Sequence, residues 1–296
     1  KSVIFEQYYC EPHIWSVITE SSNIYAMIIG MNYMTYLYET HYFEFDGDSW
    51  SNITITEHGF GLDINLHDSR PYICYRDTSD GYLYYSEYNG DDFTNIMTIP
   101  DVYRADSEID SNGNIHIIYT DYSKTSTSYA FYDGNMLSYD IVDRYSDTIA
   151  LSVDSNNTPH IVYGTQTSGD YLGKYAFLNE TGWEYAPFSP TPVYQLGNPI
   201  FDRDYKPYIP YHGTLADNYV FGYYHYDGDM WSDHLIDDVS RPGSPGSYPP
   251  NPNPPIMISD DFGGIHAIYA FALTGPYEGG IISIRYYYEP TPYEPP

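Results

Sequence analysis

Charged and aromatic side chains follow several short apolar runs, at positions that loops between strands would occupy. The set combines cationic, acidic and tyrosine residues and comprises Tyr75, Arg76, Asp77, Tyr119, Asp121, Tyr211 and His212. Tyrosine rings can stack on sugars, arginine donates hydrogen bonds, and a desolvated aspartate can act as an acid or a base. If these loops share one face, the residues are expected to form a ligand-binding groove suited to a glycan.

Two pairs of aspartates offer hard oxygen ligands of the kind that calcium prefers. They are Asp46 with Asp48 and Asp202 with Asp204, and neither pair has EF-hand spacing. Aspartates near turns are equally typical of side chains that cap neighbouring backbone amides. Calcium is therefore the one candidate cofactor, and no other is predicted.

The charge balance excludes several kinds of partner. The chain has 11 basic and 41 acidic residues, a net charge of −30. Nucleic acids require clustered Lys and Arg, so they are not expected partners. No apolar run is long enough to span a bilayer. The 39 tyrosines instead favour sheets, sugar-binding surfaces and protein interfaces.

Several features are typical of an extracellular protein. The chain begins at Lys1 and shows no signal-like leader, which favours a mature secreted protein. Glycosylation sequons place candidate acceptors at Asn52, Asn156 and Asn179. Cys10 and Cys74 are the only cysteines, so they either form one disulfide or include a buried apolar thiol.

The elements that must position these residues recur six times along the chain. Each repeat has a short apolar run that ends in or near tyrosine, such as Ile115–Tyr119 and Pro159–Tyr163. The runs start 44 to 48 residues apart, and the last interval is 58. Such a period, built from β-branched and aromatic runs between Gly, Asn, Asp and Pro, predicts an all-β chain that forms a six-bladed β-propeller.

Each repeat is expected to form a four-stranded antiparallel blade, and residues 1–289 a single domain. The predicted blades span about 13–57, 60–101, 104–143, 146–187, 193–238 and 255–289. Residues 241–255 are rich in proline and lie between the last two blades, either as a long loop or as a binding arm. Residues 290–296 form a proline-rich tail.

One blade lacks a strand in the sequence. A turn followed by the fourth strand recurs at 46–50, 89–93, 133–137, 179–183 and 227–231, but has no sixth copy. The preceding segment at the N-terminus has strand composition and is predicted to fill the gap, namely Ser2, Val3, Ile4, Phe5, Glu6, Gln7, Tyr8 and Tyr9. This strand closes either its own ring or the last blade of a neighbouring copy.

The clearest repeat, Asp110–Asp121, resembles those of secreted β-propellers related to sialidases and polysaccharide lyases. The resemblance covers almost the whole chain through its repeat pattern, and it implies carbohydrate binding or cleavage. The sialidase Asp-box is absent from this sequence, and the arginines are too scattered to assign an arginine triad. No catalytic residue is carried over.

The sequence favours a non-enzymatic extracellular protein with a structural or adhesive role, a subunit of a fibre or matrix linked by strand exchange. Its partners would be other copies of itself, extracellular glycans or both. The alternatives are a secreted propeller that binds or degrades polysaccharides and a general protein-interaction scaffold. The absence of catalytic motifs favours the first reading over an enzyme.

Overall fold

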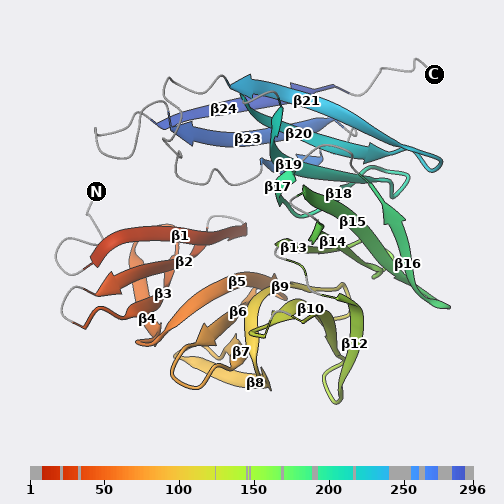
Figure 1. Ribbon diagram of the computed structural model, residues 1–296. Coiled ribbons are helices and arrows are strands. Elements are labelled where there is room, and N and C mark those ends of the chain that lie inside the picture. The colour runs from red at the N-terminus through yellow and green to blue at the C-terminus, as the bar shows by residue number, and fades with distance from the viewer. Residues whose placement is uncertain are drawn as a thin grey trace. The chain divides into compact units, whose positions relative to one another are not determined.

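The computed structural model describes residues 9–20, 23–32, 35–123, 125–144, 146, 148–167, 170–188, 193–215, 218–239, 255–259, 264–272 and 282–290. These residues form six antiparallel sheets and contain no helix. The chain divides into two compact units, residues 1–145 and 146–296. Each unit holds three of the sheets, whose strands follow one another in chain order (Figure 1).

The first unit contains three four-stranded sheets. Sheet 1 consists of β1 (Tyr9–Glu20), β2 (Asn23–Asn32), β3 (Tyr38–Phe45) and β4 (Trp50–Thr56). Sheet 2 consists of β5 (Gly59–His67), β6 (Arg70–Asp77), β7 (Leu83–Tyr88) and β8 (Phe93–Ile99). Sheet 3 consists of β9 (Val102–Ile109), β10 (Ile115–Asp121), β11 (Ser126–Tyr132) and β12 (Leu137–Arg144).

In the second unit, one sheet has four described strands, one has five and one has three. Sheet 4 has four strands: β13 (Thr148–Val153), β14 (Pro159–Thr167), β15 (Asp170–Asn179) and β16 (Gly182–Pro187). Sheet 5 has five strands: β17 (Val193–Leu196), β18 (Ile200–Phe201), β19 (Pro207–Leu215), β20 (Asn218–Tyr226) and β21 (Trp231–Val239). Sheet 6 has three described strands: β22 (Ile256–Ser259), β23 (Ile265–Ala272) and β24 (Ile282–Glu289).

The prediction of four strands is therefore corrected at sheet 5, whereas the three described strands of sheet 6 agree with a last blade that lacks a strand of its own. In sheet 5 the first strand is split into β17 and β18, which both pair with β19. Pro199 lies in the break and cannot donate to a ladder, which accounts for the split. In sheet 6, β24 is followed by Pro290. The predicted completing segment, residues 2–9, lies outside the described residues except for Tyr9, which begins β1 and pairs with Asn32.

The turns before the fourth strands share one mechanism. An Asp or Asn accepts hydrogen bonds from backbone amides two or three residues later, as Asp133 Oδ1 does from Asn135 N and Met136 N. Gly134 has a φ of 89°, a conformation that glycine adopts without a steric penalty. Equivalent side-chain caps are made by Asp46, Asn89, Asn179 and Asp227.

The turns between first and second strands are also capped by aspartates. Asp110 Oδ1 accepts hydrogen bonds from Asn112 N and Asn114 N, and Asp154 and Asp202 repeat the pattern. A residue inside each turn has a positive φ: Gly113 at 83°, Asn157 at 63° and Tyr205 at 60°. Tyrosine is the poorest fit for this left-handed conformation.

We expect Tyr205→Gly to stabilise the protein. Glycine removes the steric penalty of the left-handed conformation, and after its greater entropy loss the expected net gain is about 1 kcal/mol in the free energy of unfolding. Urea denaturation of the two proteins measures the change. Tyr205→Ala is the matched control, because it removes the same half-exposed ring but keeps the strain. An equal gain in both variants would contradict the backbone explanation.

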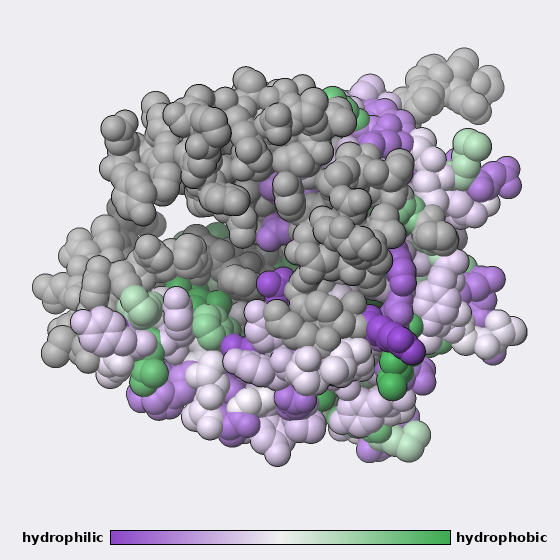
Figure 2. Space-filling model, viewed as in Figure 1, coloured by the Kyte–Doolittle hydropathy of each residue, from purple (hydrophilic) through white to green (hydrophobic). Residues whose placement is uncertain are grey.

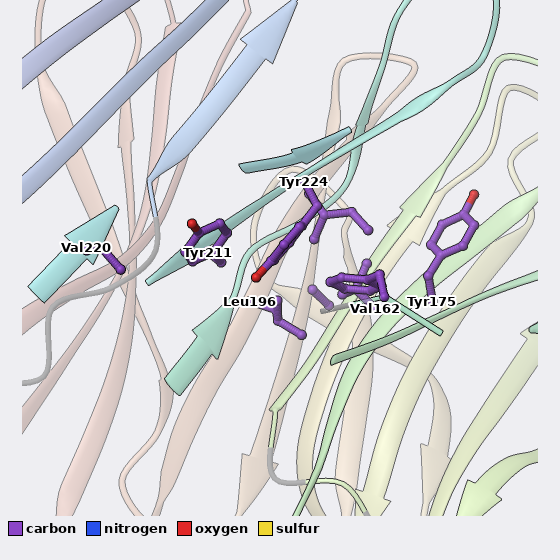
Figure 3. Packing of buried hydrophobic residues seen from close by; sticks show 9 residues of the cluster. Val162, Tyr175, Leu196, Tyr211, Val220 and Tyr224 are labelled. Carbon is purple, nitrogen blue, oxygen red and sulfur yellow. The ribbon is translucent and has the colours of Figure 1, made fainter. Parts of the chain in front are cut away.

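The core of each unit lies between successive sheets. In the first unit, Tyr25 and Tyr42 of sheet 1 pack on Ile64 and Ile73 of sheet 2. In the second unit, a cluster joins sheets 4 and 5, in which the rings of Tyr211 and Tyr224 are stacked with centroids 4.6 Å apart (Figure 3). The tyrosines thus pack largely between sheets, where each ring fills more space than an aliphatic side chain.

Cys74 belongs to the core between sheets 2 and 3. It is a free, fully buried thiol, and burial raises its pKa well above the ordinary range. The disulfide between Cys10 and Cys74 is therefore not formed, because Cys74 serves as a small apolar core residue.

Candidate functional site

Aromatic side chains from three successive sheets gather around one arginine in the first unit. We define the aromatic–arginine surface as Tyr38, Phe60, Arg76, Tyr103 and Tyr122. Tyr38, Phe60 and Tyr103 lie at the beginnings of β3, β5 and β9, whereas Arg76 and Tyr122 lie at or just beyond the ends of β6 and β10. Antiparallel pairing brings the beginning of one strand beside the end of the next, so these residues lie at the same end of their sheets.

Arg76 is the centre of this surface. Its Cζ lies 5.2 Å from the ring centroid of Phe60, 5.9 Å from that of Tyr103 and 5.8 Å from that of Tyr122. These distances are those of cation–π contacts. One Nη also donates a hydrogen bond of 2.9 Å to the backbone oxygen of Tyr103, which fixes the guanidinium between sheets 2 and 3.

One donor of the guanidinium, the buried Nε, is unsatisfied. Within the described part of the chain, Arg76 has no ion pair with a carboxylate, and its Nε has no hydrogen-bond partner. This is notable in a chain with a net charge of −30. A ligand that reaches Arg76 therefore does not have to displace an acidic side chain.

Part of the surface is open to solvent. Tyr122 is 60% exposed and Tyr38 is 41% exposed. Tyr103 and Tyr122 meet edge to face at 5.6 Å, and Tyr38 packs on Phe60 at 4.6 Å. The rings support one another, so a ligand can stack on them without first ordering a mobile side chain. On the face shown in Figure 2, the described hydrophobic residues are scattered among hydrophilic ones.

The two predicted carboxylates near this surface are engaged in loop structure. Asp77 accepts hydrogen bonds from Thr56 Oγ1 and from Ser79 N and Oγ, and Asp121 accepts bonds from Ser123, Thr125 and Ser126. Burial acts to raise both pKa values, but these hydrogen bonds outweigh it and the pKa of each carboxyl is lowered. Both carboxyl groups are therefore ionised and cap loop residues, whereas a general acid has to be protonated.

The other predicted face residues are not brought to this surface as exposed groups. Tyr211 and His212 belong to the second unit and are buried in it, and burial lowers the pKa of His212 to about 4. Their assignment to an open ligand face is wrong, because they point into the packing of sheet 5. Tyr75 and Tyr119 are half-buried, and Tyr75 stacks on Tyr84 at 5.3 Å.

Two of the calcium candidates, Asp46 and Asp202, cap turns. Asp46 Oδ1 accepts hydrogen bonds from Asp48 N and Ser49 N, and Asp202 Oδ1 accepts them from Asp204 N and Lys206 N. Among the residues that the structure describes, no group of three or more His, Cys, Asp or Glu side chains could hold a metal ion.

The buried histidines form a repeated structural unit with tyrosine and aspartate. His116 Nδ1 lies 2.6 Å from Tyr129 Oη, and its Nε2 lies 3.4 Å from Asp110 Oδ2. His160 makes the same contacts with Tyr175 and Asp154, at 2.5 Å and 3.5 Å. Burial is the main cause that lowers the pKa of both histidines, to about 4 for His160. These units anchor capped turns to the strands behind them.

A buried carboxylate joins sheets 2 and 3 and was not anticipated from the sequence. Asp63 Oδ2 accepts hydrogen bonds of 2.9 Å from both Asn65 Nδ2 and Ser107 Oγ. Burial raises the pKa of Asp63 to about 6. The alternation of Asp63 and Asn65 in an otherwise apolar strand was the available sign of a polar contact between sheets.

The glycosylation candidates occupy different environments. Asn52 and Asn156 are exposed, on β4 and in the turn after β13. The amide of Asn179 instead donates to Glu184 Oε2 and caps Thr181. Across the described residues, there is no helix of the length and apolarity needed to cross a bilayer.

Solved structures identify the class of fold. The chain is similar to the β-propeller domain of the trilobed protease from Pyrococcus furiosus, for which an open velcro topology is reported, with a TM-score of 0.59 and 9% identity over 97% of this chain and 84% of that one. It is also similar to the N11 neuraminidase-like protein of an influenza virus from a flat-faced bat in Peru, with a TM-score of 0.55 and 12% identity over 94% and 88% of the two chains. A third similar structure is the polysaccharide lyase Uly1, with a TM-score of 0.51 and 8% identity over 98% and 94%.

The chain therefore has the β-propeller fold that its repeats predict, and the six sheets agree with the expected number of blades. The suspected likeness to sialidase-like and lyase-like propellers is confirmed at the level of fold. No protein-family model and no curated protein sequence matches the chain.

Proposed function

We propose that the protein is an extracellular adhesive propeller that binds glycans through the aromatic–arginine surface. The observation that carries this proposal is an arginine held among three aromatic rings, with no carboxylate partner among the described residues. One of these rings, Tyr122, and the neighbouring Tyr38 are open to solvent. Rings of this kind stack on sugar faces, and the guanidinium offers donors to hydroxyl groups.

Binding is favoured over cleavage because of the state of the nearby carboxylates. Asp77 and Asp121 are hydrogen-bonded to loop residues, and the pKa of each is lowered. Glycoside hydrolysis needs a pair of carboxyl groups, one of which is kept protonated to serve as an acid. Catalysis is the alternative function, because a polysaccharide lyase and a neuraminidase-like protein have this fold.

We expect Tyr122→Ala to weaken glycan binding about tenfold, equivalent to about 1.4 kcal/mol. A glycan array with the native protein identifies a bound oligosaccharide, and calorimetry then gives the Kd of each variant. Tyr122 is suited to this test because its ring is largely exposed and its loss leaves the Arg76–Tyr103 hydrogen bond in place.

Tyr185→Ala is the matched control for this experiment. Tyr185 is an exposed tyrosine on β16 of the second unit, at 52% exposure, so its loss removes a comparable ring that does not belong to the aromatic–arginine surface. Equal affinities for Tyr122→Ala and the native protein, or an array with no bound glycan, would overturn the proposal. Release of reducing or unsaturated ends from polysaccharide would favour the catalytic alternative.

A further inference from the structure

Within the second unit, sheet 6 carries an apolar face that no described residue of that unit covers. The side chains of Ile256, Ile258, Ile268, Tyr286 and Tyr288 are between 46% and 74% exposed. The register places Ile256 beside Ile268 and Ile268 beside Tyr286, so they form one continuous row. The neighbouring row pairs Ile258 with His266 and His266 with Tyr288.

The opposite face of the same sheet is packed normally. Met257, Ile265 and Ala267 are buried with Tyr223 of sheet 5. Tyr223 and Tyr287 also donate hydrogen bonds to Glu289 at the end of β24. Sheet 6 is thus a well-anchored sheet with one covered and one open face. Open apolar surfaces of this kind mark sites of association.

The edge of sheet 6 is open as well. β24 pairs with β23, and among the described residues no strand pairs with its other edge. In each of the other five sheets a capped turn leads into an outer strand, but here Pro290 follows directly. Unpaired strand edges are templates for another strand.

We propose that residues 2–8 of a second copy of this chain add to the free edge of β24 as its fourth strand, which joins the copies head to tail. The segment Ser-Val-Ile-Phe-Glu-Gln-Tyr directly precedes β1 and has strand composition. Seven extended residues span about 23 Å, close to the length of the eight-residue β24. In this arrangement, sheet 1 of the second copy, which follows the added strand, also covers the open apolar face of sheet 6.

Charge makes the association dependent on salt. Each copy has a net charge of −30, so copies repel one another at low ionic strength. The pairing segment itself carries a single acidic residue, Glu6, and Arg285 lies on β24. Screening by salt therefore favours the complex, and we expect the mass measured by light scattering to rise between low and physiological ionic strength. A strand that closed within its own chain would show no such dependence.

The decisive experiment mixes two variants in a Cys10→Ser background, each with one added cysteine besides the fully buried Cys74. One chain carries Ile4→Cys, and the other carries cysteine in place of Ser283, Ile284, Arg285 or Tyr286, so that four registers are covered. Disulfide formation requires Cα atoms about 4.4–6.8 Å apart, so it reports strand pairing. Because the cysteines lie on different chains, a crosslinked dimer forms only between copies. Ser138→Cys on β12, an exposed outer strand of sheet 3, is the matched control.

The proposal expects at least tenfold more crosslinked dimer for one β24 position than for Ser138→Cys. Crosslinking at the control position to the same extent would overturn it, as would no crosslinking in any mixture. A chain that carries Ile4→Cys together with a β24 cysteine tests the remaining case, in which the strand pairs with β24 of its own chain. If it crosslinks within the monomer while the mixtures do not, the strand closes its own sheet and exchange between copies is excluded. None of these outcomes depends on glycan binding.

Discussion

Gly222→Ala is expected to lower the free energy of unfolding by about 3 kcal/mol or more. A Cβ at this position would lie 2.6 Å from the backbone oxygen of His234 and 2.6 Å from Cζ and Oη of Tyr211. Neither neighbour can move without a large cost in free energy. His234 is held in the β20–β21 ladder, and Tyr211 stacks on Tyr224 and donates a 2.7 Å hydrogen bond to Asp233. Urea denaturation followed by tyrosine fluorescence measures the loss.

Gly164→Ala provides the control for this prediction. It is also a strand glycine of the second unit, but its Cβ would lie 3.6 Å from Thr148 Oγ1, an ordinary van der Waals contact. We expect a change within about 0.5 kcal/mol for this variant. If both alanine variants unfold at the same urea concentration as the native protein, the close packing of Tyr211 against β20 is not a constraint on stability.

Acidification from pH 6.5 to pH 4 is expected to remove about 3 kcal/mol of stability through His160 alone. Burial lowers the pKa of His160 from 6.5 to about 4, so the unfolded chain binds more protons than the folded one over this range. The stability from neutral His160 is complete above about pH 6.5 and is lost progressively down to about pH 4. Urea midpoints measured at intervals of half a pH unit give the profile.

The double variant His160→Phe, Tyr175→Phe isolates this contribution. It replaces both hydrogen-bonded partners with rings that fit the stack of Phe177 and Phe201, and so leaves neither partner unsatisfied. Its stability should fall less steeply than that of the native protein between pH 6.5 and 4. Parallel profiles for the native protein and the double variant would refute the assignment.

The sheets of this chain were accessible to sequence reasoning because their signals are local. The Asp-Gly and Asn-Gly turns, such as Asp133–Gly134, combine a side-chain cap with a positive φ, and apolar runs such as Ile115–Tyr119 lie between them. Each signal depends on a few neighbouring residues. The exceptions also have local causes, namely Pro199 in the split first strand of sheet 5 and Pro290 after β24.

The candidate site was only partly accessible. The sequence predicts Arg76, which follows a strand that ends in tyrosine, but its aromatic neighbours were not predicted: Tyr38, Phe60, Tyr103 and Tyr122. Phe60 and Tyr103 are the second residues of β5 and β9, at the same position in successive repeats. An aromatic residue at this position of successive repeats is the sign of Phe60 and Tyr103 in the sequence, because the beginning of a first strand and the end of the second lie at the same end of a sheet.

The sequence by itself determined the all-β class, the sixfold repeat and the capped turns, because turn chemistry and strand alternation act over two to six residues. Only the tertiary structure decided that Arg76 meets rings from two sheets while His212, chosen for a similar loop position, is buried. It also decided that Asp77 and Asp121 are used as loop caps. These outcomes depend on which side chains successive sheets press together, and that contact is a property of packing between residues distant in the chain.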